Sequence, residues 1–523
     1  MLKEVAITGR LALAVGVGDK CLPRNSPRYG MKLIQFMGVI IAWTMASSAM
    51  AEVPVLPDAA VGWSQAARND IAAAYDTLVV NHPGMYDPAN PDFPKQLDLA
   101  KAESLKLADQ VSSASGYTAS LERFSAILGD GHAQILASPE VLKATQKARW
   151  PGFVGVWRRE ALYVYRSEFG GPPSGAEIVS CDGVGIRDLI RRNVFTFRGR
   201  EKETGLWWVH SPEVFIDEGN PFITKPQTCA FRHAGREMTQ ALRWRNTNYN
   251  YHSWLEASYN GDILPVGLSE PHRGLMWVAM PSFEPGEAQR TAYRKMFATL
   301  DAERPRFVGA RAVVLDLRNN QGGSNEWGGE VARRLWGTAT IDHAMLTYLA
   351  GMKVWWRASA DNAAHLGGLI SLLRAEQRDA VADEVAPIAE GLKSASDRGD
   401  IWYVEQNHAP TITGDDERVP FTTPVYVIVP GQCASACLDM LDIVTRFPNV
   451  KLVGAPSSAD STYLEIRIAT LPSGLAKVVI PNKVYVGRPR KSGEIYQPAI
   501  INSDLDWSTD SFIALIEADL KGK

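Results

Sequence analysis

The segment GQCASACLD, from Gly431 to Asp439, follows the apolar run Val425–Val429. It contains a serine, Ser435, between two alanines. The Pro-Gly pair after this run ends a predicted strand, and a helix is predicted to begin near Ser435. A hydroxyl group there lies at the positive end of the helix dipole, and the N–H of Ala436 has no acceptor within the helix. This arrangement favours acyl transfer, with Ser435 as nucleophile and Ala436 as an oxyanion donor. The alternative is a helix-capping serine among small residues.

A second turn follows the strand-like segment Ala312–Leu315, in AVVLDLRNNQGGSNEWGG. It is closed by Gly322 and Gly323, and paired glycines let a ligand approach the backbone N–H groups. Either glycine could supply a second oxyanion donor. No Gly-Lys-Ser/Thr follows, so the turn is not a phosphate loop. The alternative is a tight turn that needs only conformational freedom.

Three strings, VVLDLRNNQGG, VYVIVPGQCASACLDML and VKLVGAPSSADS, resemble those of the C-terminal processing (tail-specific) serine peptidases and their tricorn-core and interphotoreceptor-retinoid-binding-protein relatives. The strings of this family are close to DLRxNxGG, TxSAAE and GexTxG. The resemblance implies a crotonase-like α/β peptidase core, preceded by a helical N-terminal domain and a PDZ-like β-rich module. It makes Ser435 the nucleophile and assigns the oxyanion hole to Gly322, Gly323 and Ala436.

The chain departs from the Ser-Lys members of this family in the segment GAPSSADS. Those peptidases carry a lysine about 25 residues after the serine, where this chain has Asp460, and no lysine lies between Lys451 and Lys477. This difference argues against a Ser-Lys dyad. The acidic residue that the family carries four positions after the serine is Asp439, which either orients the helix or faces solvent.

The tricorn-like branch takes its base from an LxDGHT-like string, which LGDGHAQIL resembles, and this nominates His132. A serine hydroxyl needs a neighbouring base, and histidine titrates near neutrality. The resemblance makes Glu494, in RKSGEIYQPAI, the carboxylate that orients the imidazole. The usual Gly-Val-x-Pro-Asp ending is absent there, with Gln497-Pro498-Ala499 in its place. His82 is an alternative base.

The segments that must position these residues divide into three predicted domains. Residues 52–148 carry apolar residues at helical spacing and form a helical N-terminal domain. Residues 149–262 are β-rich and resemble a PDZ-like module, with Gly152, Phe153, Val154 and Gly155 as a carboxylate-binding loop for substrate; the alternative is a packing domain without a peptide groove. Residues 263–523 alternate strands and helices as an α/β core. A helical insertion at about 343–415 suits a lid, an oligomerisation arm or a passive surface excursion.

The amino terminus predicts export. Residues 1–30 resemble a mis-assigned upstream extension, and residues 31–51 have the charged start, apolar centre and Ala-Met-Ala end of a signal peptide. The apolar run from Leu33 to Met45 is shorter than the ~20 residues that span a bilayer, so a membrane anchor is the weaker alternative. The most direct destination is a bacterial periplasm.

Four cysteines remain after the predicted cleavage, and an oxidising compartment permits disulfides between them. Cys181 and Cys229 lie in strand-like segments of one domain and could pair. Cys433 and Cys437 are four residues apart and could bridge the serine turn. In both cases the alternative is a pair of buried small side chains.

Composition excludes several other classes of function. A net charge of −3 gives no electrostatic footprint for nucleic acid, and the sequence carries no metal or cofactor motif. The leading hypothesis is an exported serine peptidase that hydrolyses polypeptides through an acyl-enzyme. A non-catalytic protein that binds an apolar ligand or a peptide, and a hydrolase of small esters or amides, are the alternatives. The sequence does not give the oligomeric state.

Overall fold

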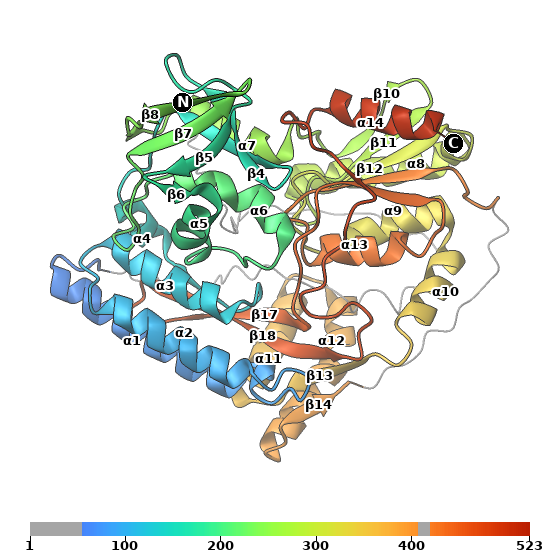
Figure 1. The fold of residues 1–523 in the computed structure, drawn as a ribbon. Coiled ribbons are helices and arrows are strands. Elements are labelled where there is room, and N and C mark those ends of the chain that lie inside the picture. Colours follow the sequence, from blue (N-terminus) through green and yellow to red (C-terminus); the bar gives the residue numbers. More distant parts are fainter. Residues whose placement is uncertain (1–54, 406–418, 523) are drawn as a thin grey trace.

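The computed structural model describes residues 55–405 and 419–522 (Figure 1). The predicted upstream extension and signal peptide lie outside these residues. The described chain is a mixed α/β protein, as predicted. None of the helices in this part combines the length and hydropathy needed to cross a bilayer.

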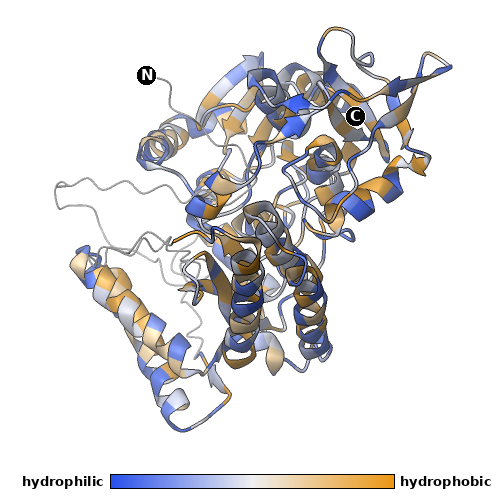
Figure 2. Ribbon diagram, turned by 90° about the vertical axis from the view of Figure 1, so that its left-hand side faces the viewer, coloured by the Kyte–Doolittle hydropathy of each residue, from blue (hydrophilic) through white to orange (hydrophobic). Residues whose placement is uncertain are grey.

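The helical domain begins with α1 (Ala60–Asn81), α2 (Phe93–Ala108) and α3 (Ala114–Leu128), drawn in blue in Figure 1. Each helix buries an apolar stripe. Figure 2 shows that helices of this protein carry both hydrophilic and hydrophobic residues. Gly129 ends α3 in the left-handed conformation, with φ 69°. The chain then turns through Asp130 and His132 into β1 (Gln134–Ala137).

A composite sheet connects this domain to distant parts of the chain. Strand β1 pairs antiparallel with β18 (Ala476–Val486), which also pairs with β17 (Tyr463–Thr470) and β13 (Lys353–Arg357). Strand β14 (Trp402–Val404) adds to β13. The sheet therefore fixes the turn that precedes β1 against the C-terminal part of the chain.

The predicted insertion is more than a helical excursion. Its helices α10 (Thr338–Tyr348), α11 (Ala360–Ala375) and α12 (Asp379–Asp397) are accompanied by β13 and β14, which are members of the composite sheet. Helices α11 and α12 pack together over a buried apolar cluster that includes Trp356 of β13. Residues 406–415 of the predicted insertion lie outside the described part.

The β-rich module contains a sheet with the strand order β3 (Phe153–Arg158), β4 (Ala161–Ser167), β5 (Glu177–Cys181), β7 (Thr228–His233) and β8 (Arg236–Ala241). Cys181 and Cys229 are direct partners on β5 and β7, and a disulfide joins them. This confirms the first predicted pair. Helix α7 (Tyr249–Asn260) packs against β3 at the edge of the sheet.

The core sheet has the order β10 (Gly267–His272), β11 (Leu275–Ala279), β12 (Ala312–Asp316), β15 (Val425–Val429), β16 (Val450–Gly454) and β19 (Ile500–Ile501). All pairs after β10–β11 are parallel. Helices α8 (Glu287–Val308), α9 (Glu326–Trp336) and α13 (Ala436–Val444) share one buried cluster with the sheet, and α14 (Thr509–Lys521) shares the other. Figure 1 shows α14 and α13 on opposite sides of the sheet.

The neighbouring strands β12 and β15 position the two predicted turns. Their parallel pairing brings both carboxyl ends to the same edge of the sheet. Ligands of open α/β sheets bind in the crevice outside such strand ends. The glycine turn and the serine turn are therefore neighbours in space.

Candidate active site

Ser435 occupies a strained turn between β15 and α13. Its backbone has φ 54° and ψ −128°, a region that residues other than glycine rarely adopt. Such strain costs of order 1–3 kcal/mol and persists only where the surrounding structure enforces it, which is common at active sites. The Ser435 hydroxyl makes no capping hydrogen bond to α13. The geometry therefore lacks the contact that the helix-capping alternative requires.

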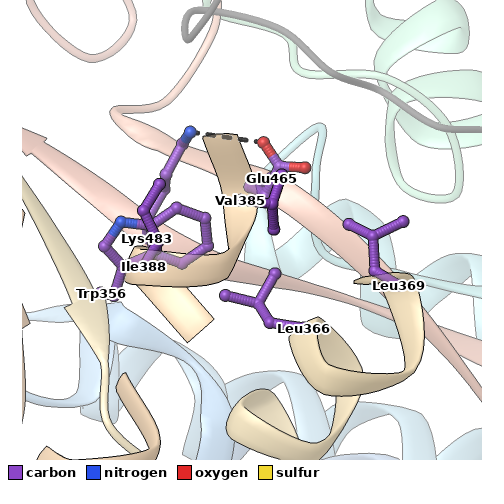
Figure 3. Close-up of a pocket in the computed structure, with 7 residues that line it drawn as sticks. All are labelled: Trp356, Leu366, Leu369, Val385, Ile388, Glu465 and Lys483. Carbon is purple, nitrogen blue, oxygen red and sulfur yellow. Dashed lines mark hydrogen bonds and ion pairs between the residues drawn. The ribbon is translucent and has the colours of Figure 1, made fainter. Parts of the chain in front are cut away.

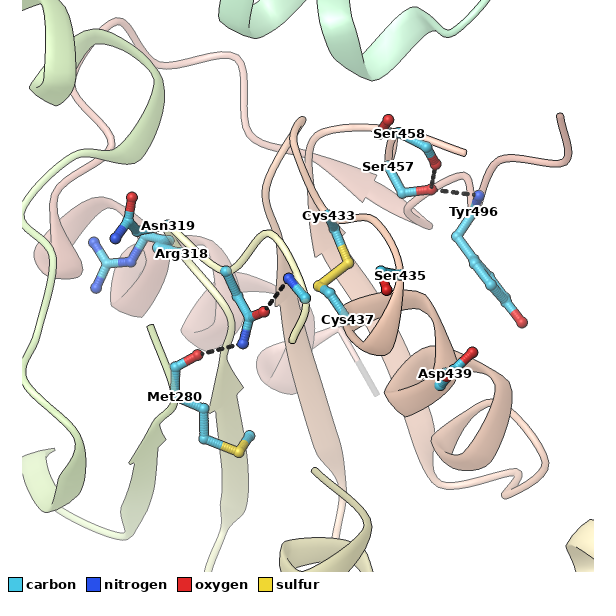
Figure 4. The surroundings of a disulfide bond; sticks show 12 residues. Met280, Arg318, Asn319, Cys433, Ser435, Cys437, Asp439, Ser457, Ser458 and Tyr496 are labelled. Carbon is cyan, nitrogen blue, oxygen red and sulfur yellow. Dashed lines mark hydrogen bonds between the residues drawn. A yellow bond between two sulfur atoms is a disulfide. The ribbon is translucent and has the colours of Figure 1, made fainter. Parts of the chain in front are cut away.

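A disulfide between Cys433 and Cys437 brackets the serine, as Figure 4 shows. Both cysteines are fully buried, and their Cα atoms are 5.3 Å apart. This confirms the second predicted pair. The bridge joins the loop before Ser435 to the first turn of α13, and so it restrains the segment that carries the strained backbone.

The two disulfides are expected to separate stability from activity. The chain-entropy model assigns about 2 kcal/mol to the four-residue separation of Cys433–Cys437 and about 4 kcal/mol to the 48-residue separation of Cys181–Cys229. Replacing the first pair by alanine should lower the melting temperature less than replacing the second. It should nevertheless slow the acylation of Ser435 on the order of tenfold or more, because small misplacements of a nucleophile are costly.

Thermal unfolding and the rate of labelling by an active-site serine probe, both measured on the two double variants, check this expectation. The Cys181/Cys229 variant is the matched control, because it loses a disulfide far from Ser435 in the sequence. Equal labelling rates in the two variants would contradict a positioning role for the Cys433–Cys437 bridge.

The glycine turn packs directly against the serine turn. Gly322 has φ 105°, and a Cβ there would lie 2.6 Å from Ala434 O and 2.8 Å from Ser435 Cβ. Gly323 has φ 126°, and a Cβ there would lie 2.1 Å from Phe283 O. Both positions therefore require glycine for conformation and for space.

Two N–H groups at this contact have no acceptor in the described part of the chain, those of Gly323 and Ala436. The N–H of Gly322 instead donates to Asn320 Oδ1 at 2.9 Å. Asn320 is itself held by its Nδ2, which donates to Met280 O at 2.8 Å. Among the three predicted donors, Gly323 and Ala436 are thus the two available to an oxyanion.

His132 lies on the turn between α3 and β1, and its side chain is half-buried. Its backbone N–H donates to Asp130 Oδ1 at 2.9 Å, and the same oxygen accepts a 2.8 Å hydrogen bond from Ser461 Oγ. The Nδ1 atom of the His132 ring is buried and has no hydrogen-bond partner. The turn that carries His132 is therefore tied to the residue that follows Asp460.

His82, the alternative base, is fully buried and has both ring nitrogens engaged. Nδ1 accepts from Gly84 N at 2.9 Å, so Nε2 carries the proton and faces Asp130 Oδ2 at 3.3 Å. Burial lowers the pKa of His82, although Asp130 opposes this effect. His82 therefore orients Asp130, which in turn holds the His132 turn.

Asp460 is a buried carboxylate that contacts the backbone of Ser435. Its two oxygens accept the Ser435 N–H at 3.0 and 2.9 Å, and Arg490 Nη1 lies 3.3 Å from Oδ2. Burial by itself would raise the pKa of Asp460, but the charges of Arg490 and His132 and the Ser435 N–H outweigh it and lower the pKa. Because the pKa is lowered, the carboxylate is ionised at neutral pH and loses its charge only as the pH falls below the ordinary range of aspartate.

A buried charge cluster fixes α13 beneath the serine. Arg490 pairs with Asp439 at 2.9 Å and with Asp442 at 3.1 Å, and Arg488 pairs with both aspartates. The Asp439 side chain is 16% exposed and thus orients the helix, one of its two predicted roles.

Glu494 is exposed on a turn, where its Oε2 accepts from Lys491 N at 2.9 Å. The neighbouring Gly493 N–H donates to Asp460 O at 2.9 Å, which places this turn beside Asp460. No hydrogen bond or ion pair between Glu494 and His132 is present in the described structure. The role of Glu494 as the third member of the triad stays a prediction.

The four residues of the predicted carboxylate-binding loop, Gly152–Gly155, are all buried at the start of β3. Phe153 packs against Phe215 and Phe231, with ring centroids 4.7 and 5.8 Å away. The prediction that this loop binds a substrate carboxylate therefore has no exposed surface to support it, and it stays a prediction.

Sequence reasoning missed the functions of Asp130 and Asp460. Asp130 forms an Asx-turn with the N–H two residues on, and the Asp-Gly-His string carries the composition of such a turn. Asp460 was singled out only because it occupies the position of a missing lysine. Its contact with Ser435 depends on a tertiary arrangement that has no local signal.

A cavity of about 30 Å³ lies away from this site, between α11, α12 and the composite sheet (Figure 3). Five apolar side chains line it together with Lys483 and Glu465, whose Nζ and Oε2 atoms are 3.3 Å apart. The volume accommodates about two water molecules. Residues 55–405 and 419–522 contain no cluster of three or more side chains suited to a metal ion.

Comparisons with known proteins identify the fold. No family model and no curated protein matches the sequence. Among solved structures, mature CPAF matches with a TM-score of 0.57 and 14% sequence identity, over 88% of this chain and 97% of that chain. CPAF complexed with lactacystin matches with a TM-score of 0.56 and 14% identity, over 88% of this chain and 98% of that one.

The photosystem II D1 C-terminal processing protease also matches, with 15% identity over 83% of this chain and 92% of that chain, but with a TM-score of only 0.32. CPAF matches over most of both chains. At 14% identity this likeness concerns the fold. The predicted resemblance to the C-terminal processing peptidases and their relatives is thus confirmed at the level of the fold, which this chain shares with CPAF.

Proposed function

We propose that this protein is a serine peptidase in which Ser435 is the nucleophile and His132 the general base. The observation that carries the proposal is the strained Ser435 backbone at the start of α13, packed against Gly322. The N–H groups of Gly323 and Ala436, next to this contact, have no acceptor in the described chain. A strained serine beside two available donors is the arrangement that acyl transfer requires.

The reaction proceeds in two stages. His132 takes the hydroxyl proton of Ser435 while Oγ attacks the substrate carbonyl carbon, and the developing oxyanion accepts hydrogen bonds from Gly323 and Ala436. The imidazolium then gives its proton to the leaving amine, and the acyl-enzyme forms. Water, deprotonated by His132, attacks the acyl carbon and releases the carboxylic acid and the free Ser435 hydroxyl.

The finer assignments belong to the same proposal. Residues 263–523 form a crotonase-like core and residues 149–262 a PDZ-like module, after the helical domain of residues 52–148. The substrate is a polypeptide, and Glu494 is the third member of the triad. Export to the periplasm after cleavage of residues 31–51 is supported by the two disulfides, since such bonds persist in oxidising compartments.

A fluorophosphonate probe tests the proposal directly on the mature protein from Glu52. The wild type should be labelled at one serine, and Ser435→Ala should remove the label because the probe forms its covalent bond with Oγ. Peptide mapping by mass spectrometry identifies the site. Failure to label a correctly folded, disulfide-bonded wild type, or unchanged labelling of Ser435→Ala, would overturn the proposal in favour of a binding protein.

A further inference from the structure

We propose that Asp460 is a positioning residue that holds the Ser435 backbone and supplies the negative charge next to His132. This inference rests on the proposed function and deepens it. It assigns a role to the aspartate that stands where Ser-Lys peptidases carry their lysine. In this chain the position has thus changed from a base to a carboxylate that supports a histidine base.

Asp460 contacts the backbone of Ser435 directly. Asp460 accepts the Ser435 N–H with both oxygens, at 3.0 and 2.9 Å, at a residue whose φ is 54°. Hydrogen bonds to an ionised acceptor are roughly twice as strong as neutral ones. The carboxylate therefore fixes the direction of this N–H and helps to enforce the strained φ angle. It also occupies the Ser435 N–H, so that only Gly323 and Ala436 remain as oxyanion donors.

The segment that carries Asp460 is held by hydrogen bonds on both sides. On one side, Glu203 Oε2 accepts from Ser458 Oγ at 2.7 Å and from Ala459 N at 3.0 Å. On the other side, Ser461 Oγ donates to Asp130 Oδ1, the same atom that holds the His132 backbone. The segment is thus fastened to the turn that carries the base, while Asp460 itself is fastened to the nucleophile.

Several charged side chains surround Asp460 and His132. The His132 N–H and Ser461 Oγ both donate to Asp130 Oδ1, so the residue next to Asp460 shares an acceptor with the His132 turn, and His132 Nδ1 is buried without a partner among the described residues. The charged groups that face this region from other elements are Arg200, Glu203, Arg488 and Arg490. Glu203 pairs with Arg200, and Arg490 and Arg488 are shared with Asp439 and Asp442. With Asp460, these carboxylates outnumber the arginines, so negative charge remains beside the His132 turn.

The variant Asp460→Asn tests both the positioning of the Ser435 backbone and the charge next to His132, because it preserves side-chain size and removes the charge. We expect the acylation rate at neutral pH to fall at least tenfold. We also expect the midpoint of the acid limb of the pH–rate profile to move to lower pH, because the imidazolium loses a neighbouring opposite charge. A merely structural loss would lower the plateau without moving the midpoint. Asp379→Asn, which removes an exposed carboxylate that pairs with Arg374 on the insertion, is the matched control and should leave the midpoint in place.

A second measurement keeps the inference testable if the protein is not acylated at all. The His132 ring can be titrated by NMR in the Ser435→Ala background, with and without Asp460→Asn, while thermal unfolding verifies that both chains are folded. A shift of the His132 midpoint to lower pH supports Asp460 even if the proposed peptidase activity fails. An unchanged midpoint with Asp460→Asn overturns the inference.

Discussion

Replacing His132 by alanine is expected to slow the acylation of Ser435 by about 10²–10⁴-fold, the usual contribution of a general base. A serine hydroxyl is a weak nucleophile without a base to take its proton. His82 should not substitute for His132, because its ring is fully buried and both of its nitrogens are engaged with Gly84 and Asp130. The second-order rate of fluorophosphonate labelling measures the effect.

The loss should be selective for proton transfer. His132 is half-buried on a turn, and its ring makes no hydrogen bond that its removal would break, so the melting temperature should change little. Added imidazole should restore part of the labelling rate in His132→Ala, because it can enter the space left by the ring. It should restore nothing in Ser435→Ala. A wild-type labelling rate in His132→Ala would exclude His132 as the base.

Replacing Gly322 by alanine is expected to lower the acylation rate by about 10²–10³-fold, the cost of losing one oxyanion donor. The added methyl group would stand 2.6 Å from Ala434 O and 2.8 Å from Ser435 Cβ, and both contacts are too short to be tolerated. The turns must therefore move apart, which displaces Gly323 from Ala436. The labelling rate and the rate of hydrolysis of an activated ester both report this change.

Gly170→Ala is the matched control for this experiment. Gly170 also has a positive φ, 79°, but a Cβ there would meet nothing within 4 Å. It therefore carries the backbone cost of alanine in the left-handed region without a steric clash. Gly170→Ala should lose stability but keep its labelling rate. If both variants labelled equally fast, the contact between the two turns would have no function in acylation.

The sequence predicted the parts of this structure that depend on local signals. Val425–Val429 followed by Pro-Gly predicted a strand that ends at the serine turn, and the paired glycines predicted the second turn. Because β12 and β15 are adjacent and parallel, these two local predictions meet at one edge of the sheet. Both disulfides were also among the predicted alternatives, since their spacing and compartment made each possible.

The rest depends on contacts between distant segments. Nothing local indicates that β13 and β14 of the insertion join a sheet with β1 and β18. The partners of Asp460 likewise come from separate parts of the chain, Ser435 from the serine turn and Arg490 from the region after β18. Composition also did not show that Gly152–Gly155 are buried, because GFVG fits a binding loop and a buried strand equally well.

The composite sheet has a consequence for the order in which the chain is made. His132 precedes β1, and β1 is held by β18, where Gln134 pairs with Val479. A growing chain on the ribosome therefore carries the proposed base before Ser435, Asp460 and the strand that anchors the His132 turn have emerged. A chain that ends before β18 lacks that strand, so the proposed site cannot assemble in it.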